Sequence, residues 1–279
     1  MKDRFKYLAK KYYYDKDKAE FVRNFIYERC HHVEGEWAGR PFELLDCQWE
    51  DIIKPVFGLY EYKGGPRLIK ECYIEIPKKN GKTTLLAALE NYLLFGDGEP
   101  GAQVYNCAGD DSQAELLFRT AKYMVINDHI LKANSQQLRT EIRYKNNFIK
   151  KLTSKAETKH GINAHAVIYD ELHAANDQEL YDTLKYAGAQ RRSSIFFQIT
   201  TAGYDRTSIC WARHEYTRQI NEGIFEDDQF WGVIYAAKES ADPFDPQTWS
   251  DANPMYRHSE TFRKNFKRMR SRQKIISRF

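Results

Sequence analysis

The chain has 279 residues, of which 42% are hydrophobic and 29% are charged, and its formal net charge is +4. This composition excludes wholesale disorder, because enough apolar residues are present to build a sizeable core. No stretch approaches the ~20 apolar residues that a membrane span needs, and the first residues lack the apolar centre of a secretory signal. The five cysteines are an odd number without a CxxC pair, which argues against a disulfide framework or a zinc ribbon.

In chain order, the sequence predicts a helix over Lys18–His31, followed by a loop and a second short helix before Gly58. Strands are predicted at Glu71–Ile76, Gln103–Ala108, Ala166–Tyr169, Ser193–Thr200 and Phe230–Ala236. Helices are predicted at Lys82–Phe95, Ser112–Asn127, Gln178–Ala187 and Thr207–Glu222, and a hairpin at Leu138–Arg143 with Asn147–Leu152. Strands that alternate with helices predict an α/β fold with a mostly parallel central sheet, covered by helices on both faces.

We expect three parts: an N-terminal helical segment at residues 1–34, a nucleotide-binding domain at 35–240, and a linker or lid region at 241–279. The last boundary rests on a change of composition, because the Pro- and Asp-rich stretch DPFDPQTWSDANP leads into a basic tail. That tail holds eight basic and no acidic residues after Glu260. Basic ends with nearby aromatics suit a polyanion such as nucleic acid, and a solvated helix face is the alternative.

A candidate phosphate loop, IPKKNGKTT from Ile76 to Thr84, follows the first predicted strand of the sheet. GKT at a helix start is typical of a nucleoside triphosphate site, where backbone N–H groups and the helix N-terminus hold the phosphates. Lys82 would add a charge at the β and γ oxygens, and Thr83 would ligate Mg²⁺. The match is degenerate, because Ile76 replaces the first glycine of the full pattern. Lys78 is either a second charge on the γ-phosphate or a solvent-facing side chain.

Two carboxylates, Asp170 and Glu171, end the apolar run AVIY. An Asp at a strand end can hold Mg²⁺, while the next acid can orient and deprotonate the attacking water. Thr200 and Thr201 end the next strand, where their hydroxyls can touch both the γ-phosphate and the catalytic acid. Because parallel strands end at one edge of a sheet, we expect these motifs to share one crevice. Together they predict an enzyme that hydrolyses a nucleoside triphosphate.

The three histidines His160, His165 and His173 match no familiar spacing of metal ligands. We therefore expect them to be loop and packing residues, with His173 close to the catalytic acid.

The segments WAGRPFELLDCQ, IPKKNGKTT, HGINAHAVIYDELHA, ITTAGYD and WSDANP together resemble the ATPase domain of the large terminase subunit of tailed bacteriophages. The resemblance implies a P-loop NTPase fold of the additional-strand class, with ATP and Mg²⁺ as cofactors. It implies that Gln48 contacts adenine and that Asp170 binds the metal next to the catalytic Glu171. It also implies a coupling motif at the end of the following strand, formed by Thr200, Thr201 and Gly203. The nucleotide-binding loop would comprise Pro77, Lys79, Asn80, Gly81, Lys82, Thr83 and Thr84.

In the same family an arginine often stands where this chain has Lys78, and lysine lacks its planar fork. The resemblance further implies double-stranded DNA, a portal protein and a small terminase subunit as partners, in the cytoplasm of an infected bacterium. A homo-oligomeric ring on the portal would let a neighbouring subunit complete each site, with Lys159, Arg191 or Arg192 as the candidate basic residue. The family's nuclease domain is not expected here, because no strand after the coupling motif ends in an acid pair.

Two other functions stay open. A superfamily-two helicase-like translocase also has DELH and an upstream glutamine, but it needs a second motor domain with arginine fingers. A non-enzymatic DNA-binding assembly module would have a dead nucleotide site, against which the intact Lys82, Thr83, Asp170 and Glu171 argue.

Overall fold

The structure is a computed structural model that describes residues 2–152, 161–203, 205–238 and 240–276, with side chains described up to residue 270. The α-helices are α1 (Lys2–Lys11), α2 (Lys16–Arg29), α3 (Asp46–Gln48), α4 (Lys54–Gly58), α5 (Lys82–Phe95), α6 (Asp111–Asn127), α7 (His129–Ala133), α8 (Gln178–Tyr186), α9 (Ile209–Asn221), α10 (Pro246–Ala252), α11 (Met255–His258) and α12 (Glu260–Ile276). Two 3₁₀-helices and one π-helix add η1 (Gly35–Trp37), η3 (Leu172–Ala174) and η2 (Trp49–Ile53).

The strands are β1 (Tyr13–Tyr14), β2 (Leu59–Tyr60), β3 (Glu71–Glu75), β4 (Gln103–Ala108), β5 (Gln136–Gln137), β6 (Glu141–Tyr144), β7 (Asn147–Lys151), β8 (Ala166–Asp170), β9 (Ile195–Thr200) and β10 (Phe230–Ile234). Within the described residues, eight of them form one sheet in the order β10-β3-β9-β8-β4-β7-β6-β5. The pairs from β10 to β7 are parallel, and those among β7, β6 and β5 are antiparallel.

The position of β9 defines the class of the fold. This strand lies between β3, which leads into the phosphate loop, and β8, which carries the acid pair. It is the inserted strand of the additional-strand class. The predicted α/β fold with a mostly parallel central sheet is therefore confirmed.

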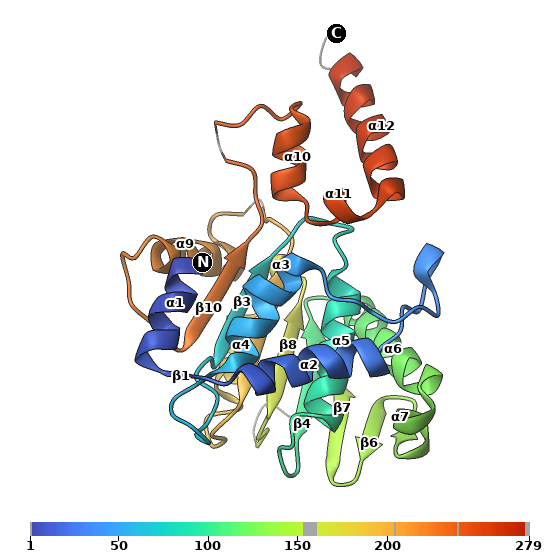
Figure 1. Cartoon of the computed structure of the whole chain (residues 1–279), viewed down its shortest axis with the longest axis vertical. Coiled ribbons are helices and arrows are strands. Elements are labelled where there is room, and N and C mark those ends of the chain that lie inside the picture. Colours follow the sequence, from blue (N-terminus) through green and yellow to red (C-terminus); the bar gives the residue numbers. More distant parts are fainter. Residues whose placement is uncertain (1, 153–160, 204, 239, 277–279) are drawn as a thin grey trace.

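Alternate side chains of the central strands enter two apolar cores, one on each face of the sheet. On β8, Ile168 belongs to the core that also contains residues of α2, α4, α5 and α6, whereas Tyr169 belongs to the core shared with α8 and α9. This period of two is the one that a strand buried on both faces requires. Helices consequently cover both faces, with α2, α4 and α5 in front of the sheet in Figure 1.

The N-terminal helices pack on the central sheet. Leu8 of α1 and Val22 and Ile26 of α2 are fully buried in the same core as α5. In addition, the Arg4 guanidinium donates hydrogen bonds to the carbonyl oxygens of Asp227 and Phe230 at the start of β10. The first 34 residues thus contribute to the core of the central domain.

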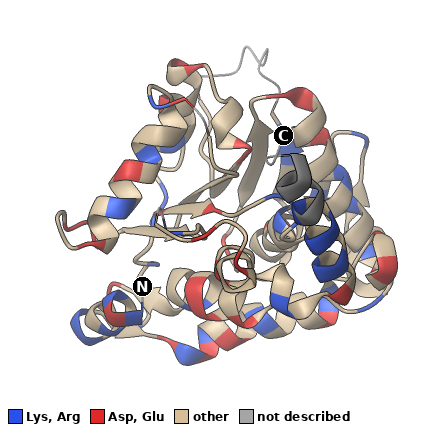
Figure 2. Ribbon diagram, turned by 90° about the horizontal axis from the view of Figure 1, so that it is seen from above, with Lys and Arg blue, Asp and Glu red and all other residues tan. Residues whose placement is uncertain are grey.

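The C-terminal helices α10, α11 and α12 lie beyond the edge of the sheet at which β3 and β10 end (Figure 1). They are held together by aromatic contacts of Trp249 with Tyr256 and Phe266. Lys and Arg residues recur along α12, which leads to the C-terminus in Figure 2. In the part of the chain that is described, no helix combines the length and apolarity that a bilayer crossing requires.

The expected elements agree closely with the structure where local signals are strong. The predicted helix at Lys82–Phe95 and strand at Gln103–Ala108 have the bounds of α5 and β4. The first arm of the hairpin was placed wrongly at Leu138, because β6 begins at Glu141. Leu138 instead closes the turn from β5, where its N–H donates to the carbonyl oxygen of Glu141.

Candidate functional site

The phosphate loop joins β3 to α5, and its backbone enters the left-handed region at Lys79 (φ 68°) and Gly81 (φ 78°). A Cβ at Gly81 would meet only the Gln48 Nε2 atom, at 3.9 Å, so the glycine is required by the backbone angle rather than by crowding. The left-handed Lys79 costs on the order of 1–3 kcal/mol, a strain common at functional sites. The bend leads into the first turn of α5, where the N–H groups of a helix start are suited to bind a phosphate.

Asn80 maintains the shape of this loop. Its side chain is 1% exposed, and Nδ2 donates to the carbonyl oxygens of Pro77 (3.1 Å) and Lys78 (3.3 Å). Pro77 and Asn80, both predicted to bind nucleotide, therefore fix the backbone of the loop. The side-chain amide nitrogen of Asn80 is therefore used in hydrogen bonds within the loop.

Lys82 at the start of α5 meets the acid pair. Its Nζ lies 3.1 Å from Glu171 Oε1, and the two side chains are 10% and 20% exposed. Glu171 itself has a left-handed backbone (φ 51°, ψ 50°) directly after β8. The structure thus brings the predicted phosphate-binding lysine and the predicted base together at the carboxyl edge of the sheet, as expected for open α/β folds.

Asp170 ends β8 and is 3% exposed. Burial, together with the neighbouring charge of Glu171, raises the pKa of the Asp170 carboxyl to about 6, and Lys82 opposes this shift. One of its oxygens accepts the Glu171 N–H at 2.8 Å. Thr83 is half-buried in the first turn of α5. A buried carboxylate destabilised by desolvation and a hydroxyl are oxygen donors that suit Mg²⁺, so these two residues fit the predicted metal.

The end of β9 contacts the catalytic turn through His173. The Thr200 Oγ1 atom accepts the backbone N–H of His173 at 3.1 Å and lies 3.2 Å from its Nδ1. The same Nδ1 is 3.2 Å from Glu171 Oε2 and 3.4 Å from Thr201 Oγ1. The polar strand end therefore reaches Glu171, the predicted catalytic acid, through the imidazole of His173, whereas a direct contact of the threonine hydroxyls with the acid was expected.

Gln48 lies on the other side of the phosphate loop. It is 3% exposed, and its Oε1 accepts the Leu45 N–H at 2.9 Å, which leaves Nε2 directed toward Gly81. A cavity of about 240 Å³ opens here between the loop and an aromatic wall. Its lining includes His32, Trp37, Phe42, Gln48, Gly81 and Thr84. Glu34, Glu36, Glu43 and Lys79 also line the cavity, while the flat aromatic wall and the Gln48 amide are the features that suit a nucleobase.

The three aromatic residues of that wall were not among the predicted site residues. His32 packs edge-on against both Trp37 and Phe42, with ring centroids 5.2 Å apart in each pair. The aromatic residues precede Gln48 within one short loop, which is the signal that could have identified them.

A larger cleft, of about 960 Å³, opens on the side of the loop that faces β9, β10 and α12. Lys78 and Lys79 are exposed on its wall, together with Thr201 and His173. Arg268 of α12 lines the same cleft from the opposite side. Lys78 is thus placed in the cleft that holds the polar end of β9, and both of its predicted roles remain predictions.

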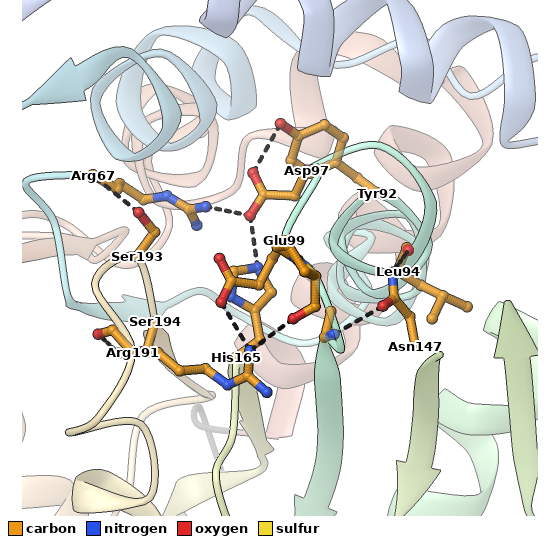
Figure 3. A network of polar contacts seen from close by, with 12 residues as sticks. Arg67, Tyr92, Leu94, Asp97, Glu99, Asn147, His165, Arg191, Ser193 and Ser194 are labelled. Carbon is orange, nitrogen blue, oxygen red and sulfur yellow. Dashed lines mark hydrogen bonds and ion pairs between the residues drawn. The ribbon is translucent and has the colours of Figure 1, made fainter. Parts of the chain in front are cut away.

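The basic residues that were candidates for completing the site of a neighbouring subunit differ in the contacts that they make within their own chain. Arg191 was expected to be able to act in trans, but its guanidinium donates to the carbonyl oxygens of Asn163 (2.8 Å) and Gly101 (2.6 Å) and pairs with Glu99 at 2.8 Å (Figure 3). Arg191 therefore holds its own subunit together, and this part of the prediction is wrong. Arg192 is exposed and donates to the Tyr62 hydroxyl. The third candidate, at position 159, lies outside the described residues.

Figure 3 also explains the predicted packing role of His165. This fully buried ring places Nε2 2.7 Å from Asp97 Oδ2, and the same carboxylate pairs with the buried Arg67 and accepts the Tyr92 hydroxyl. Burial opposes ionisation of Asp97, but Arg67 and His165 hold the pKa of this carboxyl below its ordinary value. The network lies at the amino ends of β4, β8 and β9, which is the sheet edge opposite the phosphate loop.

Comparisons with known proteins agree with this geometry. A family model described as "Terminase large subunit, ATPase domain" matches residues 49–219. The chain is 24% identical over 260 residues to the terminase large subunit of Lactococcus phage p2, which corresponds to 88% of this chain and 46% of that protein. It is also 33% identical over 104 residues to Protein YmfN of Escherichia coli (strain K12), covering 37% of this chain and 23% of that protein.

Among solved structures, the crystal structure of the HK97 bacteriophage large terminase has the same fold, with a TM-score of 0.76 at 22% identity. The similarity covers 92% of this chain and 51% of that chain, so this chain spans about half the length of the terminases that it matches. The matched family segment contains the phosphate loop, the acid pair and the end of β9. On this evidence from sequence and fold, the chain belongs to the terminase large subunit ATPase domain family.

Proposed function

We propose that this chain is the ATPase motor of a viral terminase large subunit, which hydrolyses ATP to move double-stranded DNA into a procapsid. The observation that carries the proposal is the meeting of Lys82 and Glu171, with Nζ and Oε1 3.1 Å apart, at the carboxyl edge of the sheet. One residue suits a phosphate oxygen and the other suits an attacking water.

The aromatic cavity beside Gln48 and the larger cleft lined by Lys78 suggest how the nucleotide is oriented. The base occupies the aromatic cavity beside Gln48, and the phosphates follow the loop to the first turn of α5. Asp170 and Thr83 would hold Mg²⁺, which when bound would neutralise charge on the phosphoryl group that is transferred. Lys78, on the wall of the larger cleft, is placed to add a positive charge beside the γ-phosphate.

Hydrolysis requires Glu171 to exchange its partner. A carboxylate oxygen that is bonded to Lys82 is not free to orient water, whereas a γ-phosphate draws the ammonium away from it. Glu171 then accepts the proton of the attacking water, while His173 keeps its second oxygen oriented toward the end of β9. Binding of ATP and activation of the base are thereby linked through one lysine.

The partners follow from charge and from the family. The basic side chains along α12 suit the phosphate backbone of double-stranded DNA, with affinity that falls as salt rises (Figure 2). We propose that the portal protein and the small terminase subunit are further partners, and that copies form a ring in the cytoplasm of an infected bacterium. The exposed Arg192 is then the described candidate for completing a neighbouring site.

Steady-state ATP hydrolysis with and without linear double-stranded DNA tests the proposal. We expect slow hydrolysis that DNA stimulates, more strongly at 50 mM than at 200 mM salt, and that is lost in Lys82→Ala. Hydrolysis no faster than that of Lys82→Ala would favour the non-enzymatic assembly module. ATP-dependent unwinding of a tailed duplex would favour the helicase-like translocase.

A plasmid assay with Mg²⁺ or Mn²⁺ tests the companion expectation that this chain does not cut DNA. Cutting that disappears on replacing one acid after Gly203 with alanine would reveal a nuclease site.

A further inference from the structure

A segment far from the phosphate loop in sequence is bonded to it in space. We name residues 253–259, which follow α10 and contain α11, the C-terminal strap. Asn80 of the loop donates from Nδ2 to Asn253 Oδ1 at 3.2 Å, and Asn80 Oδ1 accepts the Met255 N–H at 2.9 Å. The two asparagines are 173 positions apart, and the strap lies outside the segment that matches the family.

The amide of Asn80 is satisfied on both sides, which fixes its orientation. Its nitrogen shares two protons among the oxygens of Pro77, Lys78 and Asn253, while its oxygen faces the N–H of Met255. A rotated amide would place oxygen against three oxygens. Because the side chain is 1% exposed, water does not replace a lost partner, and loss of Asn253 Oδ1 would leave the two amide protons with only the carbonyl oxygens of Pro77 and Lys78.

The strap is itself firmly anchored. The Asn253 side chain, 7% exposed, donates from Nδ2 to the carbonyl oxygen of Trp249 at 3.0 Å, so its Oδ1 is presented to Asn80. At the other end, the Ser259 hydroxyl lies 3.4 Å from the Glu36 carboxylate, and Thr261, just beyond the strap in α12, donates to the same carboxylate at 2.9 Å. Glu36 lines the aromatic cavity beside Gln48, so the strap is fixed on both the base side and the phosphate side of the site.

The strap also lies where the two cavities meet. Met255 lines both the aromatic cavity and the larger cleft. Asn80 stands between Lys79 and Gly81, the two loop residues with positive φ. A small rotation of Asn80 would consequently redirect the N–H groups of its neighbours, which are those that the phosphates need.

We propose that Asn253 is a positioning residue of the nucleotide site, which acts through Asn80 to keep the phosphate loop in its binding shape. The inference rests on the proposed binding of ATP at this loop. It extends the working nucleotide site into the region after Ala241, which the sequence indicates to be a linker or lid. The strap contributes to the affinity for nucleotide without touching the reacting atoms.

The test compares Asn253→Ala, Asn80→Ala and the double variant for binding of ATPγS and for hydrolysis. Loss of one buried hydrogen bond predicts that Asn253→Ala weakens ATPγS binding by about three- to tenfold. KM for ATP should rise by a similar factor while kcat stays within about twofold. The double variant should bind no more weakly than Asn80→Ala, because both substitutions remove one interaction.

Gln247→Ala is the matched control, because Gln247 is exposed on α10 and bonds to Asp251 rather than to the loop. It should bind ATPγS like the unmodified chain. Equal affinity of Asn253→Ala and Gln247→Ala, or full additivity in the double variant, would overturn the inference. Absence of ATPγS binding in the unmodified chain would instead refute the proposed function itself.

If Asn253→Ala fails to fold, hydrogen–deuterium exchange in the unmodified chain and in Asn80→Ala tests the inference instead. By linkage, ATPγS that orders the loop must also order the strap. We expect ATPγS to slow exchange in the peptide containing Met255–Ser259, and to slow it at least threefold less in Asn80→Ala. Equal slowing in both proteins, or no slowing in either, would contradict the inference.

Discussion

The Lys82 ammonium and the Glu171 carboxylate meet at 3.1 Å although 89 positions separate them in the chain. The contact joins the start of α5 to the end of β8 and is largely shielded from solvent. In the proposed site, ATP phosphates would compete with Glu171 for the same ammonium. Nucleotide binding and activation of the base would then be two results of one exchange of partners.

Replacing Lys82 by alanine should weaken nucleotide binding itself. The substitution removes a charge that pairs with the phosphates in the ground state, so affinity for both ATPγS and ADP should fall by at least about tenfold. Fluorescence titration with a labelled nucleotide measures this loss. Lys185→Ala, at an ion pair with Glu71 far from the loop, provides the control and should bind normally. Unchanged affinity in Lys82→Ala would exclude the lysine from the phosphate site.

His173 should affect turnover rather than affinity. Its ring lies between Glu171 Oε2 and Thr200 Oγ1, so His173→Ala should lower kcat by about tenfold and leave KM for ATP nearly unchanged. His173→Asn retains a polar atom near the position of Nδ1 and should recover part of the rate. Steady-state kinetics of the three proteins measure both constants. A rise in KM without a change in kcat would show that His173 serves binding instead.

Local signals predicted much of the fold and the reacting residues. The apolar run ending in Asp170 and Glu171 identified β8 from its composition alone, and the GKT sequence identified the start of α5. Alternation of strands and helices was sufficient for the sheet class, because a parallel sheet needs helical crossovers. These features depend on neighbours in the sequence.

The missing features depend on distant contacts. Nothing near Asn253 indicates that its side chain meets Asn80, and Arg191 carries no local sign that three carbonyl groups and one carboxylate surround it. The order of strands was likewise implied only by the resemblance to a known family. β9 follows both β3 and β8 in the sequence but lies between them in the sheet. Contacts between residues that are distant in the sequence can be identified only from the folded structure.

Glu90 of α5 should make stability depend on pH. The side chain is fully buried, and burial raises the pKa of its carboxyl from 4.5 to about 8. Between these values the folded chain retains a proton that the unfolded chain has released, so the free energy of unfolding falls as pH rises. Glu90→Gln removes this titration. Its melting temperature relative to the unmodified chain should therefore increase from pH 5 to pH 8, and a constant difference would contradict the assignment.

The buried pair of Arg67 and Asp97 should be essential for folding stability. Asp97→Asn leaves the Arg67 guanidinium buried without its counter-charge, which should cost about 3–5 kcal/mol in the free energy of unfolding. Glu99→Gln is the matched control from the same network, because Arg191 keeps its carbonyl partners there. Urea denaturation measures both variants. A similar small loss in both would show that the Arg67 pair contributes no more than the less deeply buried pair of Arg191 and Glu99.

The central claim is that Glu171 is the base of an ATP-hydrolysing site, and Glu171→Gln tests it most directly when binding and turnover are measured on the same preparation. The amide keeps the shape of the side chain but cannot take a proton, so turnover should fall by at least ~10²-fold. ATPγS affinity should stay equal or rise, because Lys82 no longer pairs with a carboxylate. A Glu171→Gln variant that hydrolyses ATP at the unmodified rate, or that loses nucleotide binding as Lys82→Ala does, would contradict the account.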